Sequence, residues 1–372
     1  MPEIWLKYGN TDIALDIKFE NLLKNISSDF PSLTDDEIRS ELSNVLLDDN
    51  MLIFALSDSK YVARVITILL EMARAKGFVN VTIDVLPKVE TTLKTNFADK
   101  TISMNRIGYQ SFHNRIEKFQ NIIFISQISY DPLFGFSGTP TILLRNYVYE
   151  QMLESFQARQ GDLPQPGVSG PPLKIALSNS EKISAKSIEI IANSLGIAGI
   201  YYGNIIEAFQ NAVTKLQSIS VIEVELAKSA IISASSEIGP HLTLADSLNS
   251  LWNSVHIVRE NGSAVLIAEN RNGIGGGALQ MLIEGRLNIE ELKQKAVYID
   301  GLEHILYIEE LRQKCEFGIV STLPQYYLKT KLGFRVYESM KDVLEKLLVK
   351  HGKNHKVLVL SDADVFLVFT DR

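Results

Sequence analysis

The chain has 372 residues, a hydrophobic share of 46%, a charged share of 22% and a formal net charge of -7. These values are typical of a globular protein with two domains, and they disfavour disorder and nucleic-acid binding, because no basic stripe can neutralise phosphates. The apolar runs are too short to cross a bilayer and no leader sequence is recognisable, so we expect no membrane partner and a cytoplasmic location. The one cysteine, Cys315, excludes an internal disulfide and is more simply a buried thiol than a reactive one.

The first quarter of the chain predicts a hairpin and then two strands linked by a helix. Residues 3–19 alternate apolar and polar side chains on both sides of Gly9-Asn10, which is typical of a β-hairpin. Thr34 and Glu37 fit a capping box, in which each side chain satisfies a free amide at the start of a helix. A strand–helix–strand unit follows, with strands at 52–56 and 79–85 and a helix at 61–75.

Strands and helices continue to alternate as far as residue 216. A segment rich in Gly and Pro at 159–172 predicts an exposed loop. The expected elements are a strand at 122–125, a helix from Thr141, a strand at 173–177, a helix at 185–195, a strand at 197–201 and a helix at 205–216. A parallel sheet covered by helices is the simplest arrangement for such alternation.

The pattern restarts after residues 218–226, where we place a domain boundary. We therefore predict an α/β protein of two domains, 1–220 and 221–372, with mostly parallel, helix-covered sheets. The last two strands complete the second sheet or return to the first. The expected elements are strands at 230–234, 264–268 and 317–320, helices at 244–258 and 340–350, and final strands at 357–360 and 365–369.

Three strand ends are candidate ligand sites, because open parallel sheets bind ligands where their strands end and the following helices begin. The first is Ser57-Asp58-Ser59-Lys60, which precedes the helix at 61–75. Simple N-capping by Asp58 or Ser59 explains these residues equally well.

The second strand end is the turn Gly135 to Gly138, where missing side chains would let backbone amides approach an anionic group. An esterase elbow would need a glycine in place of Thr139, and no histidine and acid pair is evident to activate Ser137, so a hydrolase is disfavoured. The third is Gly273 to Gly277, after the strand at 264–268. Alone, such a cluster often marks only a tight turn.

These loops resemble those of the nickel-dependent lactate racemase family. Phe134 to Gly138 resembles the family segment A-G-F-S-G-G-R-K, and Ser57-Asp58 matches the start of S-D-H-T-R-P. Gly273 to Gly277 resembles a segment of G-x-x-D-G-x-G-G type. The resemblance covers nearly the whole chain and implies a two-domain α/β fold that begins with a hairpin. In the family, the lysine of the first segment carries a covalently attached nickel-pincer nucleotide, and here Thr141 holds its place.

The resemblance also implies a nickel-bound histidine, a hydride transfer and two further histidines that exchange the substrate's hydroxyl proton. None of the six histidines of this chain falls at those positions, and Asp131 replaces the histidine four residues before the glycine turn. Asp131 could ligate a hard metal, although a cap is the commoner role. Lys60 and Lys88 are the nearest lysines that could attach a cofactor, and solvated surface lysine is the alternative. Asp362 and Asp364 fit a cation site or a turn.

Three hypotheses follow. The first is a lactate-racemase-like protein that has lost the nickel-pincer machinery, has no metal ligands, and binds a small anion or nucleotide in an interdomain cleft. The second is an active 2-hydroxyacid racemase or epimerase that builds its metal site from unrecognised residues. The third is a structural or partner-binding role. The residues that would contact the cofactor-like ligand are Ser57, Asp58, Lys60, Asp131, Gly135, Ser137, Gly138, Thr139, Thr141, Gly273, Gly275 and Gly276.

Overall fold

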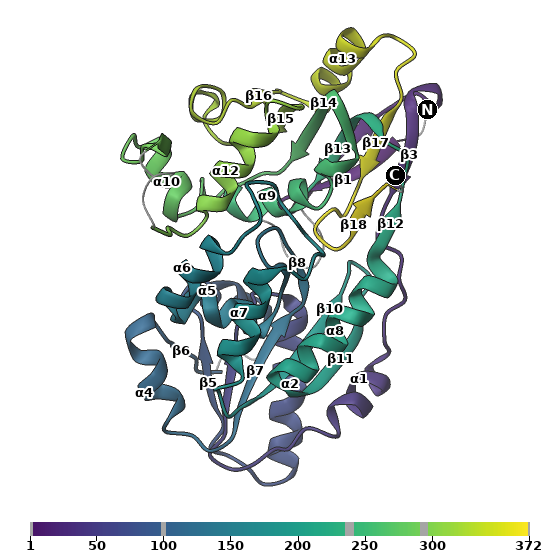
Figure 1. The fold of residues 1–372 in the computed structure, drawn as a ribbon. Helices are drawn as coiled ribbons and strands as arrows, with labels where there is room; N and C mark the ends of the chain where they lie inside the picture. Colours follow the sequence, from purple (N-terminus) through teal and green to yellow (C-terminus); the bar gives the residue numbers. More distant parts are fainter. Residues whose placement is uncertain (1–2, 98–101, 235–241, 291–296, 371–372) are drawn as a thin grey trace.

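The computed structural model describes residues 3–97, 102–234, 242–290 and 297–370. In these residues two six-stranded sheets, each flanked by helices, form two lobes that lie one above the other in Figure 1. We call the half around the sheet that contains β4 the first lobe and the half around the sheet that contains β13 the second lobe. The predicted α/β fold with mostly parallel, helix-covered sheets is confirmed.

The first sheet has the strand order β11-β10-β7-β4-β5-β6. Neighbouring strands run parallel, except that β10 and β11 form an antiparallel pair. The bounds are β4 (Leu52–Ala55), β5 (Thr82–Val85), β6 (Asn105–Arg106), β7 (Ile122–Gln127), β10 (Lys186–Ala192) and β11 (Ile197–Asn204).

Eight helices accompany this sheet in the described residues. The predicted capping box is present at the start of α1, where Thr34 accepts a hydrogen bond from the Glu37 amide. A small hairpin of β8 (Ser129–Asp131) and β9 (Gly135–Ser137) precedes α5. The helices are α1 (Asp35–Leu42), α2 (Lys60–Ala75), α3 (Glu90–Asn96), α4 (Phe112–Ile116), α5 (Thr139–Tyr147), α6 (Tyr149–Gln157), α7 (Pro171–Ser180) and α8 (Ile205–Ser220).

Two predicted elements of the first lobe are wrong. Residues 173–177, predicted as a strand, lie in the helix α7, which starts at Pro171 with proline in its first turn. Residues 185–195, predicted as a helix, contain the strand β10, whose β-branched Ile188, Ile190 and Ile191 are fully buried.

The second sheet has the order β16-β15-β14-β13-β17-β3, and all its neighbours are parallel. Its strands are β3 (Leu22–Ile26), β13 (Ala227–Ser233), β14 (Val258–Ile267), β15 (Glu316–Val320), β16 (Arg335–Val336) and β17 (Val357–Leu360). Its helices are α9 (Leu244–Trp252), α10 (Gly277–Ile283), α12 (Leu302–Leu311) and α13 (Met340–His351). Single turns complete the fold at η1 (Phe19–Asn21), η2 (Tyr109–Ser111), η3 (Val255–Ile257) and η4 (Tyr327–Lys331).

The start of the chain packs with the second lobe. The predicted hairpin is confirmed as β1 (Glu3–Tyr8) paired with β2 (Thr11–Asp16), and its apolar side chains join a core cluster with β13, β14, β17 and α13. The next strand, β3, pairs with β17. The last strand, β18 (Leu367–Phe369), pairs with β12 (Val221–Glu223). The division of the chain into domains after residue 220 stays a prediction, and the pairing of β3 crosses it.

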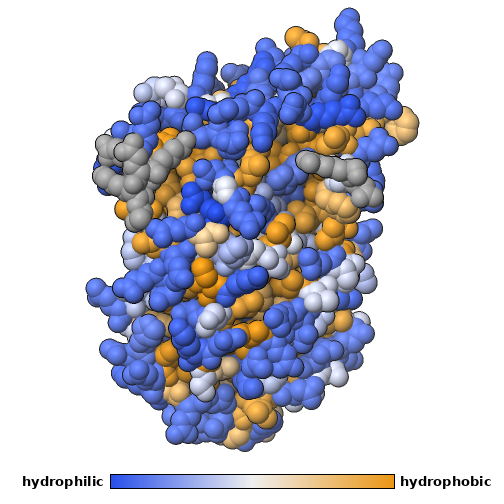
Figure 2. Space-filling view, viewed as in Figure 1, coloured by the Kyte–Doolittle hydropathy of each residue, from blue (hydrophilic) through white to orange (hydrophobic). Residues whose placement is uncertain are grey.

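A continuous apolar core links the two lobes. One cluster of buried residues includes Phe54 and Phe124 of the first sheet together with Trp252 and Phe317 of the second lobe. Figure 2 shows hydrophobic residues exposed among hydrophilic ones across the middle of this face. Cys315 is buried, as predicted, and burial raises its thiol pKa to about 11. Within the described residues, no helix is both long enough and apolar enough to span a membrane.

Candidate ligand-binding cleft

A cleft of about 540 Å³ separates the carboxyl ends of the two sheets. In the first sheet β4 leads to β5 and β6 on one side, whereas β7 lies on the other, so the strand order reverses between β4 and β7. In the second sheet it reverses between β13 and β17. Residues that follow β4, β7 and β17, and the start of α9, line the cleft. Open α/β sheets bind ligands at such reversals, and here two of them face one cavity.

The predicted site residues divide into two groups. Those that line the cleft are Ser57, Asp58, Asp131, Ser137, Thr141, Gly275 and Gly276. Those that are not part of its lining are Lys60, Gly135, Gly138, Thr139 and Gly273. The structure therefore brings all three predicted strand ends to one cavity. Only some of the predicted residues at these ends line it.

Two serines after β4 have local hydrogen-bonding partners. Ser59 caps α2 by accepting a hydrogen bond of 3.1 Å from the Tyr61 amide. The Ser57 hydroxyl accepts one of 3.1 Å from the Gln127 amide, which ties the end of β4 to the end of β7. The ammonium of Lys60 lies over the Tyr61 ring, 5.1 Å from its centroid. Capping by Ser59, one of the two alternatives for this segment, is therefore present.

Close packing alone explains two glycines of the second strand end. Gly135 has a φ of 85°, and a Cβ there would lie 2.1 Å from the Val168 carbonyl oxygen. A Cβ on Gly138 would lie 2.8 Å from the Phe209 ring. Neither residue can carry a side chain without movement of its neighbours, whether or not a ligand binds.

The chain's own side chains satisfy the amides at the start of α5. The Gly138 amide donates to the Thr141 hydroxyl over 3.0 Å, and this hydroxyl donates back to the Gly138 carbonyl over 3.1 Å. The Thr139 amide donates over 3.2 Å to the carboxylate of Glu189, which also accepts from Ser126 over 2.5 Å. Glu189 is fully buried, and burial raises its pKa. An internal carboxylate thus occupies the position where we expected an anionic ligand.

Arg145 of α5 is the main polar link across the cleft. It donates to Glu303 over 2.5 Å and to Tyr298 over 2.8 Å in the second lobe, and to Asp131 over 3.2 Å in the first. Its guanidinium lies over the Phe134 ring at 5.2 Å. Although burial opposes the charge, these neighbours raise the pKa of Arg145 well above its usual value. Asp131 also accepts from two amides of its own turn, so its capping role is present.

His304 of α12 contributes a neutral imidazole to the cleft lining. The indole nitrogen of Trp252 donates to its Nδ1 over 2.9 Å, and because an indole N–H can only donate, Nδ1 must be unprotonated. Burial lowers the pKa of His304. The imidazole proton therefore resides on Nε2. Sequence reasoning missed His304 because its indole partner is 52 residues away along the chain.

The cleft lining carries more negative than positive groups. Its cations in the described residues are Lys88 and Arg145, and Arg145 is already paired. Two almost fully buried lining residues, Glu303 and Asn253, each have one side-chain oxygen without a hydrogen-bond partner in the described structure. Both oxygens are shielded from solvent, so a ligand in the cleft does not reach them while the side chains keep these positions. The acidic residues of the lining are Asp58, Asp131, Asp246, Asp300, Glu303 and Asp364.

The residues present do not fit the nickel-pincer nucleotide that the family resemblance implies. Thr141 is 2% exposed, and both hydrogen-bonding functions of its hydroxyl are used within its own helix turn. Nδ1 of His304 is engaged by Trp252. In the described part of the chain, no three His, Cys, Asp or Glu side chains meet in a metal-binding arrangement. Asp362 instead accepts hydrogen bonds from Ser28, so a cation site with Asp364 gains no support.

Solved structures of similar fold identify the architecture. The apoprotein of lactate racemase from Thermoanaerobacterium thermosaccharolyticum matches with a TM-score of 0.77 and 14% identity, over 99% of this chain and 100% of that one. The chain has a lactate-racemase-like fold. A structural-genomics crystal structure of a Thermotoga maritima protein matches this lactate-racemase-like chain with a TM-score of 0.67 and 11% identity, over 91% of it and 99% of the other. No protein-family model and no curated protein matches the sequence.

Proposed function

We propose that this lactate-racemase-like protein binds a small anionic ligand in the cleft between its lobes and does not carry out nickel-pincer racemase chemistry. The observation that carries the proposal is the meeting of two strand-order reversals at one cavity. The volume of about 540 Å³ suits a small molecule. A cytoplasmic location is part of the proposal.

The charge of the lining restricts the class of ligand. A nucleotide would bring several negative charges to a lining in which acidic groups outnumber bases, and this repulsion disfavours it. A carboxylic acid with a neighbouring hydroxyl or amino group fits better. Its single carboxylate would pair with Lys88, and its donor group would meet the exposed carboxylates of Asp246 or Asp300. We therefore narrow the expected anionic ligand to 2-hydroxy acids and 2-amino acids.

The loss of nickel-pincer chemistry is tested by intact-protein mass and metal analysis after production together with the nickel-pincer biosynthetic enzymes. We expect an unmodified mass and no stoichiometric nickel, because Thr141 has no amine to form the covalent bond. A nucleotide-sized adduct with nickel would overturn this part of the proposal. It would support the alternative of an active 2-hydroxyacid racemase, and assays of racemisation would follow.

Ligand binding in the cleft is tested with a steric block. Gly276 lines the cleft, and a Cβ there would meet no atom within 4 Å, so the variant Gly276→Leu should obstruct part of the cavity without disturbing the fold. Gly108 is equally open but is not part of the lining, so Gly108→Leu is the matched control. We expect calorimetric titration with a panel of 2-hydroxy and 2-amino acids to detect binding to the unmodified protein and Gly108→Leu. Equal binding by Gly276→Leu would contradict the assignment of the cleft.

A further inference from the structure

A second pocket, of about 670 Å³, lies at the end of the second sheet opposite to the cleft. Its lining comes from the starts of β13 and β14, from β3 and from the loop between α13 and β17. The cleft between the lobes faces the carboxyl ends of these parallel strands, whereas this pocket faces their amino ends. It is therefore separate from the proposed ligand site.

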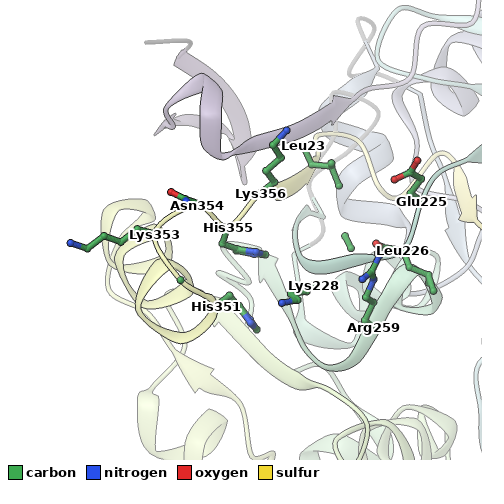
Figure 3. Close-up of a pocket in the computed structure, with 12 residues that line it drawn as sticks. Leu23, Glu225, Leu226, Lys228, Arg259, His351, Lys353, Asn354, His355 and Lys356 are labelled. Atoms are coloured by element: carbon green, nitrogen blue, oxygen red, sulfur yellow. Dashed lines mark hydrogen bonds between the residues drawn. The ribbon is translucent and has the colours of Figure 1, made fainter.

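Basic residues dominate this second pocket. The Lys and Arg residues of its lining are Lys228, Arg259, Lys353 and Lys356, and Glu225 is its one acidic member. Figure 3 shows Lys228 pointing toward His351 and His355, whereas Lys353 and Lys356 extend away. The cluster formed by Lys228, His351 and His355 thus faces a shared space. The acidic neighbours in the described structure are Glu225 of the lining and Glu316, which pairs with Lys350, so the basic groups outnumber them and attract anions.

Both imidazoles are oriented by hydrogen bonds at their Nε2 atoms. His351 Nε2 lies 3.1 Å from the Ser263 hydroxyl, and His355 Nε2 lies 2.6 Å from the Ser229 hydroxyl. The two ring centroids are 4.8 Å apart. The Lys350 ammonium donates to the Ser263 oxygen over 2.9 Å, which leaves the serine proton free to point at His351 Nε2. When the serine donates in this way, the proton of the His351 ring is on Nδ1, where it can be donated to a ligand.

The surroundings hold these histidines in the neutral form when no anion is present. Burial, Lys350 and Lys228 lower the pKa of His351, against a smaller opposing effect of Glu316. Burial, His351 and Lys228 lower the pKa of His355 to about 4. An anion placed among Lys228 and the two rings would offset the repulsion and raise both pKa values.

We propose that the pocket lined by Lys228, Arg259, His351 and His355 binds a phosphoryl group. Phosphate oxygens can accept several hydrogen bonds at once and carry the double charge that suits a lysine and two imidazole donors together, with Arg259 as a further cation on the Leu226 side of Lys228. The Nε atom of Arg259 donates to the Leu226 carbonyl over 3.1 Å, which fixes the guanidinium beside the pocket. The source of the group is inorganic phosphate or a small phosphate monoester.

The test is a proton NMR titration of the histidine Cε1–H signals with inorganic phosphate and, separately, with glycerol 3-phosphate. We expect saturable shifts and raised pKa values for two histidines. Lys228→Gln should weaken binding by at least about tenfold, because it removes a charge-assisted contact. Lys353→Gln is the matched control, since this lysine lines the same pocket but points away, and its effect should stay below about twofold.

The comparison of the two ligands identifies the source of the group. Tighter binding of inorganic phosphate supports a site for the free anion, and tighter binding of glycerol 3-phosphate supports a site for a phosphorylated metabolite. Absence of saturable shifts, or equal weakening by Lys228→Gln and Lys353→Gln, would overturn the proposal in favour of general surface attraction. Thermal unfolding will show whether both variants fold. Gly276→Leu should bind phosphate as the unmodified protein does, so failure of the phosphate proposal can be distinguished from failure of the proposed ligand site in the cleft.

Discussion

At the scale of single residues, Arg145 is a side chain that bonds to charged groups of both lobes. It is 17% exposed and pairs with Glu303, which is 1% exposed, and with Asp131. Removal of a buried cation leaves its partners as uncompensated charges, and this costs more free energy than the intact pair contributes. The residue therefore stabilises the contact between the lobes and at the same time occupies acceptors in the cleft.

We expect Arg145→Met to lower the free energy of unfolding by about 3–5 kcal/mol, because the buried Glu303 and the partly buried Asp131 lose their cation. The measurement is urea unfolding followed by circular dichroism. Arg39→Met is the control, since Arg39 forms a half-exposed pair with Glu71 at 2.8 Å and its loss should cost about 0–1 kcal/mol. Similar losses for both variants would show that Arg145 does not act as a buried link.

Glu189 makes stability depend on pH with a defined sign. Burial raises its pKa in the folded state, so its protonated form stabilises the fold below the ordinary carboxyl pKa, and this contribution is lost as pH rises through the folded-state value. We expect Glu189→Gln to match the unmodified protein at about pH 4 and to become relatively more stable toward about pH 7. Urea unfolding at several pH values measures this, and a difference that is constant with pH would contradict it.

Sequence reasoning did not find these two residues, for a physical reason. Glu189 meets the start of α5 from 50 residues away, and Arg145 meets Glu303 from 158 residues away. A charged residue inside an apolar strand, as in Ile188-Glu189-Ile190, was the available signal for a buried polar contact. No local pattern could have given its partner.

At the scale of elements, the glycine turn before α5 is a packed structural element. Gly135 combines a positive φ with a position next to the Val168 carbonyl. The internal hydrogen bonds of Thr141 and Glu189 hold the following helix start. Packing within the shared fold is therefore enough to explain why this turn matches the racemase segment, without a bound ligand.

We expect Gly135→Ala to lower the free energy of unfolding by more than about 2 kcal/mol, because the new Cβ would overlap the Val168 oxygen. Gly276→Ala has open space around its Cβ and should change it by less than about 0.5 kcal/mol. Thermal and urea unfolding of both variants provide the comparison. Tolerance of alanine at residue 135 would mean that the turn relaxes without loss of packing.

The elements that could be predicted are those with a clear period or cap. The hairpin at Gly9-Asn10, the capping box at Thr34 and the strand–helix–strand unit at 52–85 are all confirmed. The errors at 173–177 and 185–195 come from short apolar runs, which suit a strand or a buried helix equally. Pro171-Pro172 signalled a helix start, and the β-branched residues around Glu189 signalled a strand.

At the scale of the whole molecule, the fold class could be predicted because strands and helices alternate throughout. The assignment of elements to lobes could not, because pairing between distant strands leaves no local trace. The hairpin of β1 and β2 shares a core cluster with Ile231 of β13. This strand lies more than 200 residues after the hairpin in the sequence.

This arrangement predicts which strands lose protection from hydrogen exchange when the hairpin is removed. We expect deletion of residues 3–16 to accelerate amide hydrogen exchange in β13, β14 and β17, because Leu6 and Leu15 are fully buried against that sheet. Exchange in β4, β5 and β7 should change little. Exchange measured by mass spectrometry distinguishes the lobes, and faster exchange in the first sheet instead would assign the hairpin to the first lobe.

The position of β17 between β13 and β3 has a consequence for synthesis on the ribosome. The first sheet is complete once β11 has emerged, so the first lobe can fold while the chain is still growing. The second sheet lacks an inner strand until residues 357–360 appear, although its edge strand at 22–26 and the covering hairpin are made first. The nascent hairpin and β3 therefore carry apolar side chains without their final partners until residues 357–360 have been made. Apolar strands that stay unpaired are prone to aggregate, and the charged residues that alternate along the hairpin oppose this.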